Sequence, residues 1–485
     1  DELWQRRIVR EQGGDVYDFS HDKLREQAYT SLSTAHRHLL HRRVAEALET
    51  VYANTLDEVS GQVAIHYERA GLLWQAILWY QRAGEFASRI AATVEAITAY
   101  QRAAALLEAS AVAPAPQDGQ WERAAQVYTH LGDLLGMTGR SQEARQAYQQ
   151  GRMYIPAQAL LWQARLQRKI AQAWNHPSTL ETLLHGYAEA ERLLEQVPDR
   201  SSPEWHQEWL ATQLDQLLPL QLHRIPVQEM AEMLAKIQPT VEQSGTTVQQ
   251  AQFFLSAAAW HIARDRFLAS EETVAQFRSA LSAAQQTQHK SLVGFARFGL
   301  GRALFLSGRL DEAEEQMRAA MNVGDESGHV LLLERCLSFL PFIFRQRGQV
   351  EEVRWAITRA LKVPEMKLTS LLLAHRAWLT RRDGEMDKAE AYSRAALEEW
   401  QHQRQVNPHQ WAALWPLIGA LLAQQRISEA MHYERMLLDV GQRPSSEQLD
   451  ALLESAWQAW DAGQQTRAHA HLQQALLLAE EKGYL

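Results

Sequence analysis

The feature that most constrains the fold of this 485-residue chain is a spacing of small and large residues that recurs along it. The spacing is clearest in residues 125–157. There Leu131 and Leu135 lie one turn apart on one predicted helix, and Ala144 and Tyr148 lie one turn apart on the next. Two helices cannot bury such apolar stripes alone, so each pair must pack on a neighbouring pair. The sequence therefore predicts a row of helix pairs.

Local signals in the same stretch agree with a two-helix hairpin. Gly139 suits the positive φ that often follows a helix, and Ser141 can N-cap the second helix with Glu143 in its first turn. The spacing resembles a tetratricopeptide repeat of about 34 residues. The resemblance implies an all-α fold, a tetratricopeptide-like α-solenoid in which helix hairpins form a superhelix. The matching residues are Leu131, Gly132, Leu135, Gly139, Ala144, Tyr148, Gly151 and Pro156.

From residue 120 onward we count about nine helix pairs. Asp311 and Glu314 are predicted to form a capping box in one of them. Pro239, Pro341 and Pro416 fall inside helical patterns, and we expect them to kink or break those helices. The stronger pairs occupy residues 125–158, 290–326, 366–404 and 446–482, and the weaker ones 159–196, 203–243, 246–287, 330–363 and 408–441.

Composition and charge argue against several functions. The net charge of −9 argues against nucleic-acid binding by the segment as a whole. The only cysteine, Cys336, cannot form an intramolecular disulfide, which fits a reducing compartment such as the cytoplasm. The longest apolar run, Trp411–Ala423, is shorter than the roughly 20 residues of a bilayer-spanning helix. We therefore expect a cytoplasmic protein with neither a nucleic-acid nor a membrane partner.

Residues 1–52 differ from the rest of the chain. A helix is predicted at Glu2–Glu11, followed by a glycine turn and a short strand at Val16–Phe19. Ser20 is expected to N-cap the next helix, and a further helix is predicted from residue 35 to residue 51. This order of helix, hairpin and helix is typical of a winged helix, whose wing would be the small β-hairpin.

A second resemblance rests on the run Phe19–Ala28, which reads Phe-Ser-His-Asp-Lys-Leu-Arg-Glu-Gln-Ala. It is similar to the end of the winged-helix domain in STAND-class signalling ATPases, relatives of the NB-ARC proteins and of bacterial transcriptional activators with C-terminal repeats. The motif of that class is Met-His-Asp followed by Leu-Arg, and Ser20 stands here in place of Met. The resemblance implies that His21 contacts the phosphate of an ADP bound in the full-length protein.

The segment itself contains no Gly-x-x-x-x-Gly-Lys-Ser/Thr loop, so it offers no cradle for a triphosphate. ADP or ATP is therefore expected as a cofactor of the full-length protein only, and none is expected in this fragment. Because the chain begins at Asp1 without Met and inside a helical pattern, we expect it to be a piece of a longer protein. Its ending, residues 479–485, resembles the close of the repeat domain in maltose-activator-like regulators.

Four parts are predicted along the chain. Residues 1–52 form a winged-helix remnant with a linker helix, and residues 53–110 form a three-helix repeat unit. Residues 111–119 contain two prolines that interrupt the periodicity, which indicates a linker. Residues 120–485 form the tetratricopeptide-like superhelix.

No catalytic residue and no metal site is predicted. Three consecutive residues such as Ser20-His21-Asp22 cannot align as nucleophile, base and orienting group. His36, His38 and His41 are not spaced for metal binding, so we expect a solvated and mildly basic helix face. Cys336 is expected to be a buried thiol.

The most informative functional signal is a set of aromatic residues interleaved with arginines on the first helices of three successive repeats. In the repeat family these positions line a concave groove, where aromatic faces offer stacking area and guanidinium groups capture carboxylate or phosphate. The alternative is that the aromatic residues belong to the core. The candidates are Phe295, Phe298, Arg302 and Phe305, then Arg335, Phe342 and Arg345, then Trp378, Arg381 and Arg382.

Together these features indicate a non-catalytic sensor and interaction region of a STAND-type signalling ATPase, acting as a transcriptional regulator. Its partners would be an inducer or a protein bound in the groove, and the NTPase domain of the same full-length chain. The alternative is a tetratricopeptide adaptor that scaffolds protein partners without nucleotide control.

Overall fold

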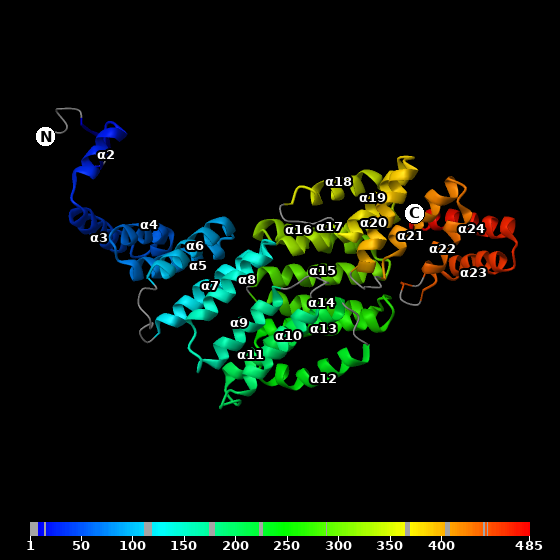
Figure 1. Cartoon of the computed structure of the whole chain (residues 1–485), viewed down its shortest axis with the longest axis horizontal. Coiled ribbons are helices and arrows are strands. Elements are labelled where there is room, and N and C mark those ends of the chain that lie inside the picture. Colours follow the sequence, from blue (N-terminus) through cyan, green and yellow to red (C-terminus); the bar gives the residue numbers. More distant parts are fainter. Residues whose placement is uncertain are drawn as a thin grey trace. The chain divides into compact units, whose positions relative to one another are not determined.

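The computed structural model describes residues 8–13, 16–110, 119–173, 180–222, 227–287, 289–363, 369–402, 408–439, 442–443 and 445–485. The described residues form 23 helices and one small two-stranded hairpin (Figure 1). Two compact units make up the chain, Asp1–Leu134 and Leu135–Leu485. The all-α prediction with a small β-hairpin is therefore confirmed. The linker predicted at 111–119 lies, except for Gly119, outside the described residues.

The first unit begins with an antiparallel hairpin of β1 (Val9–Gly13) and β2 (Val16–Phe19). Five helices follow, and in the first unit α3 packs on α4, α4 on α5 and α5 on α6. The sixth, α7, crosses the boundary between the units. Their bounds are α2 (Asp22–Ser31), α3 (Thr34–Val51), α4 (Leu56–Arg69), α5 (Leu73–Arg89), α6 (Thr93–Ser110) and α7 (Gln120–Met137).

Two predictions at the start of the chain are corrected. Residues 9–11 belong to strand β1, so the helix predicted at Glu2–Glu11 is wrong there, and residues 1–7 lie outside the described part. The N-cap position of α2 is held by His21, with no side-chain capping bond, and not by Ser20. The Ser20 hydroxyl instead donates to the carbonyl of Ile8 at 3.1 Å, because the hairpin brings those two residues together.

The second unit consists of helix hairpins in sequence. In the hairpins from α9/α10 to α23/α24 each odd-numbered helix packs on the following even-numbered one, and each odd-numbered helix from α9 to α19 also packs on the next odd-numbered helix. Helices α14, α15 and α16 illustrate this side-by-side packing (Figure 1). This is the arrangement of a tetratricopeptide-like α-solenoid. The bounds are α8 (Ser141–Tyr154), α9 (Leu160–Gln172), α10 (Leu180–Glu195), α11 (Pro203–Leu222), α12 (Val227–Ser244), α13 (Thr247–Arg264), α14 (Glu271–Gln285), α15 (Lys290–Leu306), α16 (Leu310–Ser327), α17 (Val330–Gln346), α18 (Val350–Ala360), α19 (Ser370–Arg382), α20 (Met386–His402), α21 (Trp411–Ala423), α22 (Ile427–Leu437), α23 (Glu447–Asp461) and α24 (Gln465–Glu481).

The structure agrees with part of the turn predicted between α7 and α8. Gly139 has the predicted positive φ, +83°. Ser141, however, is already the first residue of α8, and Arg140 holds the N-cap position without a side-chain capping bond. The Arg140 guanidinium donates to Glu143 at 2.7 and 2.5 Å, and this ion pair takes the place of the predicted cap.

Ion pairs also replace the side-chain capping that was predicted at the start of α16. The capping box predicted for Asp311 and Glu314 does not form at the start of α16. Both carboxylates instead pair with Arg347, at 2.5 Å each. An ion pair to a neighbouring hairpin competes with a cap for the same carboxylate oxygens, and here the ion pair is formed.

The three internal prolines do not break their helices. Pro239 lies inside α12, Pro341 inside α17 and Pro416 inside α21. Pro341 and Pro416 are buried. A proline removes one backbone donor, and the surrounding packing of these two buried segments holds the helix in register across that gap.

Candidate binding site

The candidate residues lie on α15, α17 and α19, the first helices of three successive hairpins. On α15 the stripe Phe295, Phe298, Arg302 and Phe305 follows the spacing of one helix face. Because α15 packs on α17 and α17 packs on α19, the three stripes become neighbours. The fold thus brings the predicted residues into one region of the second unit.

Five of the ten candidates are core residues. Phe298 is 4% exposed and Phe305 and Arg345 are each 1% exposed, while Phe342 and Trp378 are fully buried. This corrects their assignment to an open groove and matches the alternative that the aromatic residues are core. The reason is tertiary, because segments that follow α20 in the chain cover this face.

Phe342 shows how the covering works. Its ring lies 4.6 Å from the ring of His375, 5.2 Å from that of His409 and 5.1 Å from that of Trp411, measured between centroids. His409 precedes α21, and Trp411 begins it. The segment around residue 410 therefore fills the space in front of α17 that the sequence assigned to a ligand.

Arg345 of α17 contacts both this segment and residues near the end of the chain. Its guanidinium lies 5.4 Å from the rings of both Trp378 and Trp411, and it donates to the carbonyl of Tyr484 at 2.5 Å and to that of Ala412 at 3.4 Å. Burial and the nearby charge of Arg382 together lower the pKa of Arg345 to about 9. Arg345 therefore has a structural role here.

The two candidate arginines of α19 also hold the end of α24 and the residues that follow it. Arg381 forms an ion pair of 2.7 Å with Glu480, and Arg382 donates to the carbonyl of Leu485 at 3.1 Å. The Trp411 and Tyr484 rings meet edge to face at 5.1 Å. The inner ends of α17 and α19 are thus occupied by the chain itself.

Phe295, Arg302 and Arg335 remain partly exposed. The Arg335 guanidinium lies 5.6 Å from the Phe295 ring and 6.0 Å from the Phe298 ring. Within the described part of the chain, neither Arg302 nor Arg335 has a hydrogen-bond acceptor or a carboxylate partner, and Nε of Arg302 is buried without one. Burial and the charge of Arg335 together lower the pKa of Arg302 to about 10.

The surroundings of this arginine pair are partly apolar. The ring of His329 meets that of Phe295 edge to face at 5.1 Å, and its Nδ1 is buried without a partner among the described residues. Burial and the charge of Arg335 together lower the pKa of His329 to about 4, so His329 is neutral at pH 7. Burial raises the pKa of Glu334 and lowers that of Arg335.

His21, the nucleotide-sensing candidate, lies in the first unit. Its side chain is exposed at the start of α2, and Asp22 next to it pairs with Arg25 at 3.0 Å.

One contact between two histidines, the buried His41 and the partly buried His66, was missed by the sequence reasoning. His41 is 8% exposed, which corrects its assignment to a solvated face. Its Nδ1 lies 2.9 Å from Nδ1 of His66, and its Nε2 lies 2.9 Å from the hydroxyl of Tyr29. Burial lowers the pKa of both imidazoles. No local sequence signal reveals this contact, because His66 follows 25 residues later.

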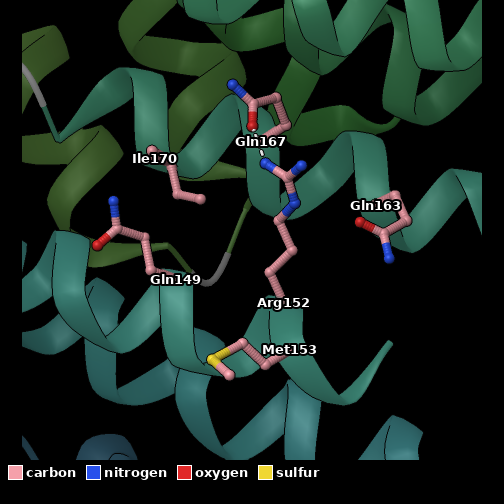
Figure 2. Close-up of a pocket in the computed structure, with 6 residues that line it drawn as sticks. All are labelled: Gln149, Arg152, Met153, Gln163, Gln167 and Ile170. Atoms are coloured by element: carbon pink, nitrogen blue, oxygen red, sulfur yellow. Dashed lines mark hydrogen bonds between the residues drawn. The ribbon is translucent and has the colours of Figure 1, made fainter. Parts of the chain in front are cut away.

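A separate pocket of about 650 Å³ opens between α8 and α9 (Figure 2). Three glutamines line it together with Arg152, Met153 and Ile170, and the Arg152 guanidinium donates to Oε1 of Gln167 across it.

The described residues include no group of three His, Cys, Asp or Glu that could hold a metal ion. Cys336 is fully buried, and burial raises its pKa.

No protein-family model matches the chain, and no curated protein matches it either. Among solved structures, a Rap protein complexed with competence and sporulation factor is 14% identical, with 75% of this chain and 97% of that chain covered and a TM-score of 0.48. The Cut9–Hcn1 hetero-tetramer of the APC/C is 15% identical, with 93% and 95% covered and a TM-score of 0.39.

A STAND protein with a tetratricopeptide repeat sensor from Pyrococcus horikoshii is 12% identical, with 97% of this chain and 60% of that chain covered and a TM-score of 0.41. All these likenesses are distant. At such identities and TM-scores they assign neither a partner nor an activity to this chain.

None of the helices in the described part of the chain has the length and apolar character that a bilayer crossing needs.

Proposed function

We propose that this chain is the non-catalytic recognition region of a STAND-type signalling ATPase that regulates transcription, and that it binds an inducer or a protein partner. The observation that carries the proposal is the row of first helices from α9 to α21, each packed on the next. Such a row builds an extended recognition surface from many short elements. The arginines Arg302 and Arg335 on that row are still available to a ligand.

The position of His21 supports the link to nucleotide control. The hairpin β1–β2 leads directly into α2, and His21 stands exposed between them. An exposed imidazole at a strand-to-helix junction can meet a phosphate held by another domain of the full-length protein. In this proposal, His21 reports whether that domain holds ADP.

The proposed mechanism is a shift between two states of the full-length protein. A ligand on the recognition surface changes the equilibrium only if it binds one state more tightly than the other. By linkage, the nucleotide must then change the affinity for that ligand by the same factor. This chain would supply the differential binding, and the NTPase domain would supply the hydrolysis.

The test uses labelled ADP and the intact full-length protein. We expect His21→Ala to weaken ADP binding by about tenfold, which corresponds to about 1.4 kcal/mol. Lys23→Ala, on the same exposed helix, should leave ADP binding unchanged. An intact protein that does not bind ADP, or that binds it equally well after His21→Ala, would contradict nucleotide sensing and favour the adaptor function.

A further inference from the structure

Two arginines on neighbouring first helices, Arg302 and Arg335, lie close enough for their charges to interact, and neither has an acceptor among the described residues. Arg335 of α17 lies over the rings of Phe295 and Phe298 of α15. Arg302 follows Phe298 by four residues on α15 and therefore lies on the same face of that helix. The two guanidinium groups thus share one place on the row of first helices.

The two arginines of the second unit that are buried among the described residues, Arg168 and Arg345, do have acceptors. Arg168 pairs with Glu208 at 2.8 Å and with Asp215 at 2.5 Å, and Arg345 donates to two backbone carbonyls. A desolvated charge without a partner is costly, because it loses its hydration and gains nothing in exchange. Arg302 and Arg335 therefore form an unusual pair, with like charges brought together and their donors unused.

We propose that Arg302 and Arg335 bind one oxyanion, a carboxylate or phosphate group, of the ligand that this region recognises. This inference rests on the proposed recognition role and adds the chemical class of the ligand. Both side chains are only partly buried, so an anion can reach them from solvent. The half-buried ring of Phe295 lies 5.6 Å from the Arg335 guanidinium and would contact an apolar part of the same ligand.

The geometry favours an oxyanion over other polar groups. A guanidinium presents a rigid fork of N–H donors that fits two oxygens of a carboxylate or phosphate at once. The Phe295 and Phe298 rings hold the plane of Arg335 in place before a ligand arrives, which lowers the entropy lost on binding. Glu334 is the nearest carboxyl group to Arg335 in the chain, and burial lowers the pKa of Arg335, whereas the charge of Glu334 raises it. Burial also raises the pKa of Glu334, which disfavours its charged form, so Glu334 competes only weakly with an incoming anion.

The experiment is a titration of the 485-residue chain in a phosphate-free buffer, followed by thermal unfolding. One arm uses inorganic phosphate and the other a capped peptide of glutamates, with the capped glutamine peptide as the neutral reference. We expect a saturable rise in Tm with at least one anion and none with the glutamine peptide. The arm that responds identifies whether phosphate or a carboxylate-rich peptide is the better source of the oxyanion.

Arg302→Met and Arg335→Met should each weaken anion binding by about tenfold or more. Arg297→Met is the matched control, because Arg297 is also on α15 but already donates to Gln316 at 3.0 Å; its effect should stay within about twofold. Without anion, Arg302→Met and Arg335→Met should unfold at the same temperature as the parent chain or higher, since they remove an uncompensated charge.

Three results would overturn the inference. The first is no response of the parent chain to either anion, and the second is equal weakening by Arg297→Met and Arg302→Met. The third is a fall in Tm of the anion-free arginine variants, which would mean that the two guanidinium groups already have structural partners. The ADP measurement on His21 does not involve this face, so the two proposals can fail independently.

Discussion

Arginine side chains in this protein have three different roles, which depend on the groups around each guanidinium. Burial alone would lower the pKa of Arg168, but the charges of Glu208 and Asp215 raise it. Arg345 has backbone carbonyls and two indole rings instead of carboxylates. Arg302 has neither among the described residues, which is why it is the best candidate for contact with a ligand.

Glu434 is the acidic counterpart of these arginines. It is fully buried in α22, both of its carboxylate oxygens lack a partner among the described residues, and burial raises its pKa to about 8. In the unfolded chain a glutamate ionises near pH 4.3. Between these two pH values the folded state holds a proton that the unfolded state has lost, so folding stability falls as pH rises.

We therefore expect Glu434→Gln to remove a pH dependence from the stability of the second unit. The parent chain should lose stability from about pH 5 to about pH 8 through this group, whereas the variant should be flatter and more stable at pH 8. Urea unfolding at several pH values measures this. Glu429→Gln, in an exposed ion pair with Arg426, is the control. Parallel pH profiles for Glu434→Gln and the parent chain would show that the carboxyl group finds a partner.

At the scale of the element, close packing between neighbouring helices depends on where the small residues lie. Gly84 of α5 faces the Tyr100 ring of α6, and a Cβ added there would lie 2.6 Å from Cε2 of that ring. Gly61 of α4 is also inside a helix, but its Cβ would lie 3.9 Å from the Cβ of Ala83, an ordinary contact. The two glycines therefore differ in their surroundings and not in their backbone.

This difference predicts opposite effects of the same substitution. Gly61→Ala should stabilise the first unit by up to about 1 kcal/mol, because alanine is the better helix former. Gly84→Ala gains the same propensity but must displace the Tyr100 ring, at a cost of about 1–3 kcal/mol, so the net effect should be destabilising. Chemical denaturation of both variants checks the sign. Equal stabilisation by both would mean that α5 and α6 can separate freely.

At the scale of the second unit as a whole, the residues after α24 close the inner face of α17 and α19. Arg345 and its acceptor Tyr484 are separated by 139 residues, and Leu485 is 1% exposed. Gly483 makes this possible. Its φ is +73°, and a Cβ at this position would collide with the backbone of Gln346.

Gly483→Ala should therefore undock this segment. Gly463→Ala is a matched control, because Gly463 has a φ of +74° with nothing within 4 Å of an added Cβ. Both variants pay about 1–2 kcal/mol for the left-handed backbone, and Gly483→Ala should lose about 1–3 kcal/mol more from the collision. Urea unfolding gives the difference, and the fluorescence of Trp411 should report the loss of its contact with Tyr484. Equal losses in the two variants would contradict the docking.

Much of the architecture could be predicted because it is encoded locally. The 3.6-residue apolar period and turn residues such as Gly139 act within one hairpin, so the helix pairs and the all-α class follow from neighbouring residues. The wrong predictions come from the same reliance on neighbouring residues. Ser141 and Asp311 were each expected to cap their own helix. Ion pairs form instead, between Arg140 and Glu143 and between Asp311 and Arg347 of a neighbouring hairpin.

The candidate site could be predicted only in part. Periodicity correctly placed Phe295, Phe298, Arg302 and Phe305 on one face of a first helix. It could not tell which of these side chains would be covered, since the covering residues lie far along the chain. The pairing of His41 with His66 was missed for the same reason.

By itself, the sequence determined the helical period, the hairpin repeat and the set of arginines and aromatic residues on the first helices, because these depend on spacings of a few residues. Only the tertiary structure decided which of those residues are buried and which remain available. Burial is set by contacts such as Arg345 to Tyr484, which join residues far apart in the chain and leave no period in the sequence.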